Sequence, residues 1–179
     1  MEQREAVALI RAAVTSEGGV WADLGAGAGV FTRALAALLG PGGTVYAVDR
    51  DADSLRNLSR PKAPARHASI RTVVGDFTEP LELPTLDGVL LANALHFVPY
   101  PDQPVAMRRV ASMVVSGGPI VIVEYDRRGG SRWVPYPISP AALVTLAADA
   151  GLAAPTPLAT QPSQYSGTIY SSLVRRALP

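Results

Sequence analysis

Residues 20–31, with the sequence VWADLGAGAGVF, carry the clearest structural signal in this chain. An apolar run containing one carboxylate, Asp23, is followed by three glycines at every second position, Gly25, Gly27 and Gly29. Apolar residues then recur at helical spacing, at positions 31, 35, 38 and 39. This pattern predicts a strand, a tight glycine loop and a helix, because such a loop uses backbone angles that disfavour a Cβ. The free N–H groups at the start of the helix suit an electron-rich ligand atom.

Two classes of ligand use a loop of this kind, and the glycine spacing distinguishes them. The dinucleotide fingerprint places its third glycine or alanine where this chain has Val30. The match to that fingerprint is therefore imperfect, and the carboxylate of Asp23 would repel a pyrophosphate. A glycine-rich turn that binds nothing is the alternative for a match to one motif alone.

The alternate glycines with Asp23 two residues ahead of them resemble motif I of the class I S-adenosylmethionine-dependent methyltransferases. S-adenosylmethionine (SAM) carries an ammonium and a sulfonium group but no pyrophosphate, so a carboxylate at the rim of its pocket is favourable. The resemblance implies that the first strand end and its loop contact the cofactor, through Asp23, Gly25, Ala26, Gly27 and Gly29.

Acidic residues also follow the second and third predicted strands. Asp49 and Arg50 come after the apolar run 44–48, and the Asp49 carboxylate can accept hydrogen bonds from two ribose hydroxyls. Asp76 and Phe77 follow the third strand. In the family that the chain resembles, a carboxylate at this place accepts a hydrogen bond from the adenine amino group, and the neighbouring main chain holds the edge of the ring.

The fourth predicted strand, residues 88–92, is apolar throughout, as expected of a central parallel strand that is buried on both faces. Asn93, Ala94 and His96 follow it. The resemblance implies that Asn93 and Ala94 hold the methionine part of SAM, and that the next residues face the methyl acceptor.

His96 is the candidate catalytic base, because histidine side chains ordinarily titrate near neutral pH. A base is needed only for an acceptor that must lose a proton, and the alternative is a packed residue that shapes the pocket. Tyr125 and Trp133 are candidates for the acceptor pocket, with ordinary packing as the alternative for each.

Composition limits the possible partners. The chain has 179 residues, 48% of them hydrophobic, which is enough for one compact domain over residues 1–179. A net charge of +1 gives no field that would attract nucleic acid, and no apolar run is long enough to span a membrane. The absence of cysteine removes thiolate metal sites and cysteine nucleophiles and favours the cytoplasm. No metal is expected.

The remaining elements complete the predicted fold. Helices are expected over residues 2–16, over residues 102–115 and after the Ser139 cap, and β-like runs near residues 157–161 and 168–175 form a terminal hairpin. The resemblance implies an α/β fold, a doubly wound three-layer α/β/α sandwich. Its mostly parallel sheet has seven strands in the order 3-2-1-4-5-7-6, with the last strand antiparallel.

The function implied is methyl transfer from SAM to a small-molecule acceptor by in-line displacement, in small-molecule metabolism. Two alternatives remain open, a non-catalytic SAM-binding or interaction protein and an NAD-dependent oxidoreductase. Val30 and Asp23 disfavour the oxidoreductase, and no Tyr-x-x-x-Lys pair supports hydride transfer. The acceptor pocket is either open or completed by a second subunit in a homodimer.

Overall fold

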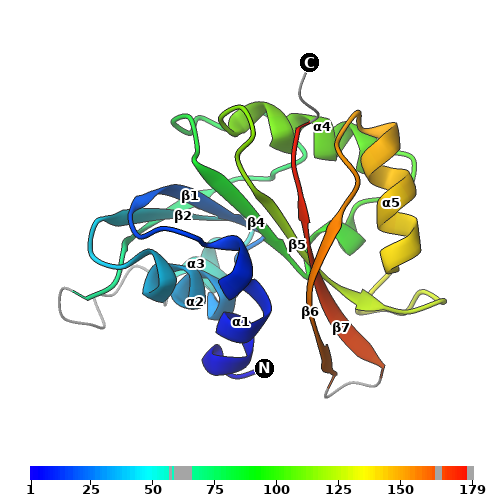
Figure 1. Ribbon diagram of the computed structural model, residues 1–179, viewed down its shortest axis with the longest axis horizontal. Coiled ribbons are helices and arrows are strands. Elements are labelled where there is room, and N and C mark those ends of the chain that lie inside the picture. Colours follow the sequence, from blue (N-terminus) through cyan, green and yellow to red (C-terminus); the bar gives the residue numbers. More distant parts are fainter. Residues whose placement is uncertain (57, 59–65, 164–166, 177–179) are drawn as a thin grey trace.

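A computed structural model describes residues 1–56, 58, 66–163 and 167–176. Its strands form one sheet in the order β3-β2-β1-β4-β5-β7-β6 (Figure 1). Strands β1 to β5 run parallel, and β7 is antiparallel to both of its neighbours. The predicted fold and strand order are confirmed. The strands are β1 (Gly19–Leu24), β2 (Gly43–Asp49), β3 (Ser69–Val74), β4 (Gly88–Ala92), β5 (Ile120–Asp126), β6 (Thr156–Pro162) and β7 (Thr168–Val174).

Helices cover both faces of this sheet. They are α1 (Gln3–Ile10), α2 (Val30–Leu39), α3 (Ala52–Leu55), α4 (Gln103–Met113) and α5 (Pro140–Asp149), with two short 3-10 helices, η1 (Arg11–Ala13) and η2 (Leu95–Phe97). The first helix is shorter than predicted, because the chain changes from α-helix to 3-10 helix after Ile10 and leaves helical geometry at Val14. The prediction for α5 is confirmed, since the Ser139 hydroxyl accepts a hydrogen bond from the Ala142 N–H.

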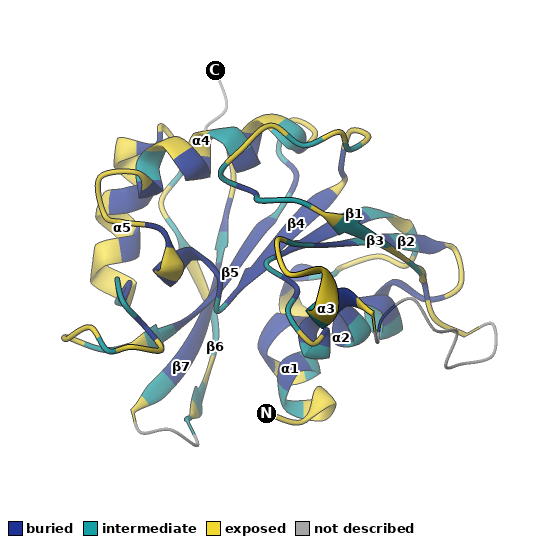
Figure 2. Ribbon diagram, turned by 180° about the vertical axis from the view of Figure 1, so that it is seen from behind, coloured by how far each residue is buried: buried dark blue, intermediate teal, exposed yellow. Residues whose placement is uncertain are grey.

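The sheet separates two apolar cores. Leu90 and Leu91 are neighbours on β4 and both are fully buried, yet they belong to different cores because side chains alternate across a strand. One core includes residues of α1 and α2, and the other includes residues of α4 and α5. The central strand β4 is accordingly buried along its whole length (Figure 2).

Strand β5 continues beyond its apolar run, residues 120–123. The sequence pattern ends at Val123, whereas the strand ends at Asp126 because Glu124, Tyr125 and Asp126 pair with β7. The extension places Glu124 inside the sheet, where it is fully buried. Within the described part of the chain, no helix combines the length and apolar character needed to cross a bilayer.

Candidate functional site

The glycine loop joins β1 to α2 at the carboxyl edge of the parallel strands. Gly25, Gly27 and Gly29 all have positive φ angles, of 79°, 50° and 79°. A Cβ added to Gly25 would lie 2.5 Å from the Cβ of Ala94, and one on Gly29 would collide with Leu58. At Gly27 no atom lies within 4 Å of the added Cβ. Packing therefore requires the outer glycines, while the space at Gly27 is open to a ligand.

Asp49 ties this loop to the end of β2. Its Oδ2 accepts a hydrogen bond of 2.7 Å from the Gly27 N–H, and its Oδ1 accepts one of 2.9 Å from the Asp51 N–H. Arg50 is exposed beside it. Asp49, at the end of β2, thus lies against Gly27, the central glycine of the loop. This is expected of a right-handed β1–α2–β2 crossover, which brings both strand ends to the same edge of the sheet.

Asp23 lies deeper than the rim position that the sequence suggests. Only 1% of the residue is exposed, because its side chain packs beneath α2, where the Thr32 hydroxyl donates a 2.6 Å hydrogen bond to Oδ2. Its other oxygen, Oδ1, is buried without a partner. Burial raises the pKa of Asp23 to about 7, with the Asp49 charge adding to the rise and the Thr32 hydrogen bond opposing it.

Asn93 holds a similar orphaned group at the end of β4, which pairs with β1. Its Oδ1 is also buried without a hydrogen-bond partner. Among the described residues, Asn93 alone has a positive φ without being glycine, at 54°. Asparagine adopts this conformation at a lower cost than most residues, and such strain is typical of functional sites. Ala94, next in the chain, is the residue that approaches Gly25.

Asp76 and Phe77 follow β3. The Asp76 Oδ1 accepts hydrogen bonds from both the N–H and the hydroxyl of Thr78. Burial acts to raise the pKa of Asp76, but the Thr78 hydrogen bonds and the Arg50 charge outweigh it, so the pKa is lowered and the group stays ionised. The Phe77 side chain packs in the core close to Gly25.

His96 is 2% exposed and forms a pair with Glu124 of β5. The Glu124 Oε2 lies 2.5 Å from the His96 Nδ1, and Oε1 accepts a 3.1 Å hydrogen bond from the His96 backbone N–H. The imidazole ring also contacts the rings of Phe97 and Tyr125, with centroid distances of 4.5 Å and 6.1 Å. Both the backbone and the ring of His96 are therefore fixed.

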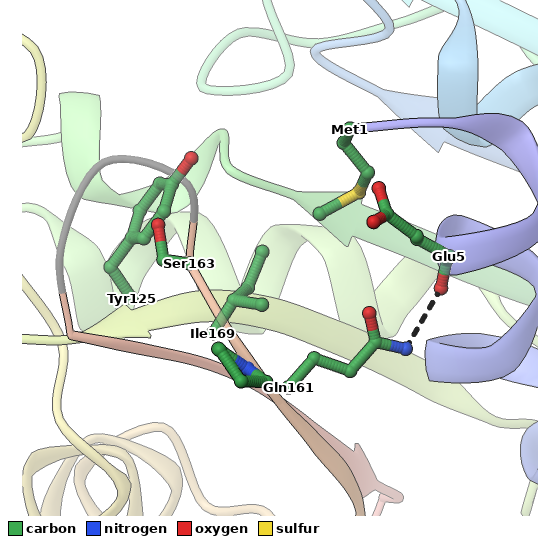
Figure 3. A pocket seen from close by; sticks show the side chains of 7 residues that line it. Met1, Glu5, Tyr125, Gln161, Ser163 and Ile169 are labelled. Carbon is green, nitrogen blue, oxygen red and sulfur yellow. Dashed lines mark hydrogen bonds between the residues drawn. The ribbon is translucent and has the colours of Figure 1, made fainter.

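Tyr125 lines a surface pocket between the start of α1 and the β6–β7 hairpin. Gln161 crosses the floor of this pocket, and its Nε2 donates a 3.1 Å hydrogen bond to the Glu5 carbonyl (Figure 3). The other lining residues are Met1, Pro162, Ser163 and Ile169. Trp133 does not line this pocket. It is 75% exposed in the loop after β5, where the Arg132 guanidinium lies 5.6 Å from its ring centroid.

Two buried polar residues of the site were not found by sequence reasoning. Thr32 orients Asp23, and Glu124 orients His96. Thr32 lies in α2 and Glu124 lies in β5, both mostly apolar elements, which was the signal available, but each partner lies in a different element. Only the folded chain brings the pairs together.

The comparisons agree with this geometry. The family described as "Methyltransferase domain" matches residues 22–118, more than half of the chain. The chain belongs to the methyltransferase domain family. The resemblance to class I methyltransferases that motif I indicates is confirmed. The matched range begins within β1 and ends just before β5, so it contains the ends of β1, β2, β3 and β4 described above. Comparison with the curated proteins gives no match.

Solved methyltransferase structures share the fold. A 1,6-didemethyltoxoflavin-N1-methyltransferase from Burkholderia thailandensis is 22% identical, with a TM-score of 0.74 over 98% of this chain and 78% of that one. An arsenic(III) SAM methyltransferase from Chlamydomonas reinhardtii is 22% identical, with a TM-score of 0.71 over 91% of this chain and 65% of that one. Human N-acetylserotonin methyltransferase is 20% identical, with a TM-score of 0.68 over 98% of this chain and 52% of that one. This chain thus spans only about half to two thirds of the latter two proteins.

Proposed function

We propose that this chain is a SAM-dependent methyltransferase that transfers a methyl group to a small-molecule acceptor. The observation that carries the proposal is the pair of buried, unpartnered oxygens, Asp23 Oδ1 and Asn93 Oδ1, at the ends of two paired strands. A buried acceptor without a donor costs about 1 to 3 kcal/mol, so two of them beside a glycine loop fit a ligand that brings donors and positive charge. The ammonium group of SAM has both.

The other residues at this edge fit the remaining parts of the cofactor. We propose that Asp49 binds the ribose hydroxyls, since each of its oxygens accepts one backbone hydrogen bond and has a lone pair left. Asp76 and the Phe77 main chain are assigned to adenine, with Arg50 beside them. Gly25, Ala26, Gly27 and Gly29 form the loop that approaches the ligand, and Ala94 completes the methionine end.

SAM supplies an activated methyl group, so this chain's residues need mainly to align the acceptor and exclude water. We assign His96 and Tyr125 to the acceptor side. Their rings are in contact, and Tyr125 lines the pocket beside α1. Trp133 remains a candidate only if the loop after β5 moves, because its ring is exposed.

A small molecule is the acceptor class that this site fits. The relatives are named for arsenic(III), didemethyltoxoflavin and N-acetylserotonin, all of them small. The net charge of +1 gives no support for nucleic acid as a partner. We further propose that residues 1–179 act as one domain in cytoplasmic small-molecule metabolism, and that a second copy in a homodimer completes the pocket.

The test is a transfer assay with SAM that carries an isotopic label on the methyl group, screened over a library of small molecules. Label in at least one product supports the proposal. If the protein binds SAM but labels no compound, the non-catalytic SAM-binding alternative is favoured. If it binds NADH and not SAM, the oxidoreductase alternative is favoured.

A further inference from the structure

Glu124 directs both of its carboxylate oxygens to one residue. Oε1 accepts the His96 backbone N–H and Oε2 lies 2.5 Å from the ring Nδ1. We propose that Glu124 is a positioning residue that holds His96 as a base, and that the acceptor is therefore a molecule whose attacking atom carries a proton, such as a hydroxyl. This inference rests on the proposed methyl transfer.

The hydrogen bond determines which ring nitrogen is free. A carboxylate accepts and does not donate, so the proton of a neutral imidazole lies on Nδ1, between the ring and Glu124. The lone pair then lies on Nε2, on the opposite side of the ring. The second bond, to the backbone N–H, fixes η2 against β5, so the direction of Nε2 is set by the fold.

Stability alone is a weak explanation for this pair. Both side chains are almost fully buried, at 2% and 0% exposure. Removing a carboxylate from water costs several kcal/mol, and buried ion pairs can often be replaced by apolar residues without loss of stability. An acidic side chain buried at the carboxyl edge of the sheet, beside the proposed acceptor side, is better explained by a chemical role.

The hydroxyl of Tyr170 does not compete with His96 for the Glu124 carboxylate. Tyr170 of β7 pairs with Glu124 in the sheet, but its hydroxyl donates a 2.7 Å hydrogen bond to the Ile138 carbonyl. Burial, followed by the charges of Glu124 and Asp126, raises the pKa of Tyr170, so this phenol stays protonated. Glu124 thus remains available to His96.

The proposed step balances as follows. The proton on the attacking oxygen passes to His96 Nε2 while the oxygen forms its bond to the methyl carbon. The bond from that carbon to sulfur breaks, and its electron pair stays on sulfur. The imidazolium that results lies beside the Glu124 carboxylate, which stabilises its charge, and the proton is later released to water.

The first test is nitrogen NMR of the histidine side chains. The chain has only two histidines, and His67 is exposed, so it serves as an internal control. We expect neutral His96 to show the Nδ1–H tautomer, while neutral His67 shows the mixture, mainly Nε2–H, of a solvated imidazole. A neutral His96 with its proton on Nε2 would overturn the proposal, whether or not the protein transfers methyl groups.

The second test is kinetic. Glu124→Gln keeps the shape but has one acceptor oxygen in place of two, so we expect kcat to fall at least tenfold with an unchanged KM for SAM. Tyr170→Phe is the matched control, since it removes a buried hydrogen bond next to Glu124 without touching His96, and kcat should persist. Equal kcat for wild type and Glu124→Gln would overturn the proposal.

The acceptor class is tested separately, with hydroxyl compounds paired with tertiary-amine or thioether analogues that have no proton to lose. Labelling of the hydroxyl members supports the inference. Labelling of only the analogues would overturn it while leaving the proposed methyl transfer intact. No SAM binding at all would instead overturn the proposed function, and the NMR result would still report on the pair.

Discussion

Asp23 is the residue whose chemistry the fold changes most at the cofactor side. The chain buries its carboxyl group with one hydrogen bond from Thr32 and leaves Oδ1 without a partner. Because burial raises its pKa from 3.8 to about 7, the ligand-free protein holds this group partly protonated at neutral pH. A cation bound nearby would favour the ionised form.

This raised pKa predicts a dependence of stability on pH. The folded pKa lies above the unfolded one, so the stabilisation is complete below about pH 4 and is lost as pH rises through about 7. Between pH 5 and 8 the Asp23 contribution to the free energy of unfolding should fall by about 2 to 3 kcal/mol. Urea denaturation of the wild-type protein and of Asp23→Asn, each at the lower and the higher of these pH values, measures this change in the free energy of unfolding. Identical pH dependence in the two proteins would contradict the assignment.

At the scale of elements, the glycine loop and the end of β4 form one unit. Gly25 is held against Ala94, and Gly27 against Asp49, so three strand ends meet around the loop. The structure separates glycines needed for packing from the glycine that leaves space. This distinction allows folding and binding to be tested with matched variants.

Gly27→Ala should fold with a loss of about 1 kcal/mol, from its positive φ alone, and should bind SAM at least tenfold more weakly. Gly25→Ala is the matched comparison, and it should lose about 2 to 4 kcal/mol because the new methyl group collides with Ala94. Thermal unfolding and calorimetry measure both properties. A stable Gly27→Ala that binds SAM as well as wild type would show that the loop is not the ligand site.

Two residues that follow β4 should have separate roles, Asn93 in binding SAM and His96 in methyl transfer. Asn93→Gly keeps the positive φ and removes the amide, so SAM affinity should fall, by about 1 to 3 kcal/mol. His96→Asn keeps a donor for Glu124, so SAM affinity should hold while methyl transfer drops about 100-fold or more. Calorimetry and the transfer assay measure the two effects. The reverse pattern, with SAM affinity lost in His96→Asn and kept in Asn93→Gly, would contradict this division.

The sequence predicted the parts of this unit that depend on local spacing. Glycines at alternate positions and acids after apolar runs are visible in the chain itself, which is why the glycine loop and the placement of Asp23 and Asp49 near strand ends could be anticipated. The strand order followed from the resemblance to class I methyltransferases that these residues carry. The depth of Asp23 depends on Thr32 across the β1–α2 turn, and the role of Glu124 depends on pairing with β7 and contact with η2. Such contacts between elements produce no repeating pattern of residues in the sequence, so they could not be predicted from it.

At the scale of the whole molecule, one sheet brings the strand ends together and two cores hold it in place. The pocket lined by Tyr125 lies where α1 meets the β6–β7 hairpin (Figure 3). Several relatives are up to twice as long as this chain, so their additional segments have no counterpart in these residues.

Isothermal titration calorimetry with SAM measures whether the ends of β1 to β4 form a SAM site. We expect binding of one SAM per chain, displacement by S-adenosylhomocysteine and no heat with NADH. The affinity for SAM should be at least fivefold weaker in Asp49→Ala, which loses the charged acceptor beside Gly27. Absence of SAM binding by the folded wild-type protein, or equal affinity in folded Asp49→Ala, would contradict it.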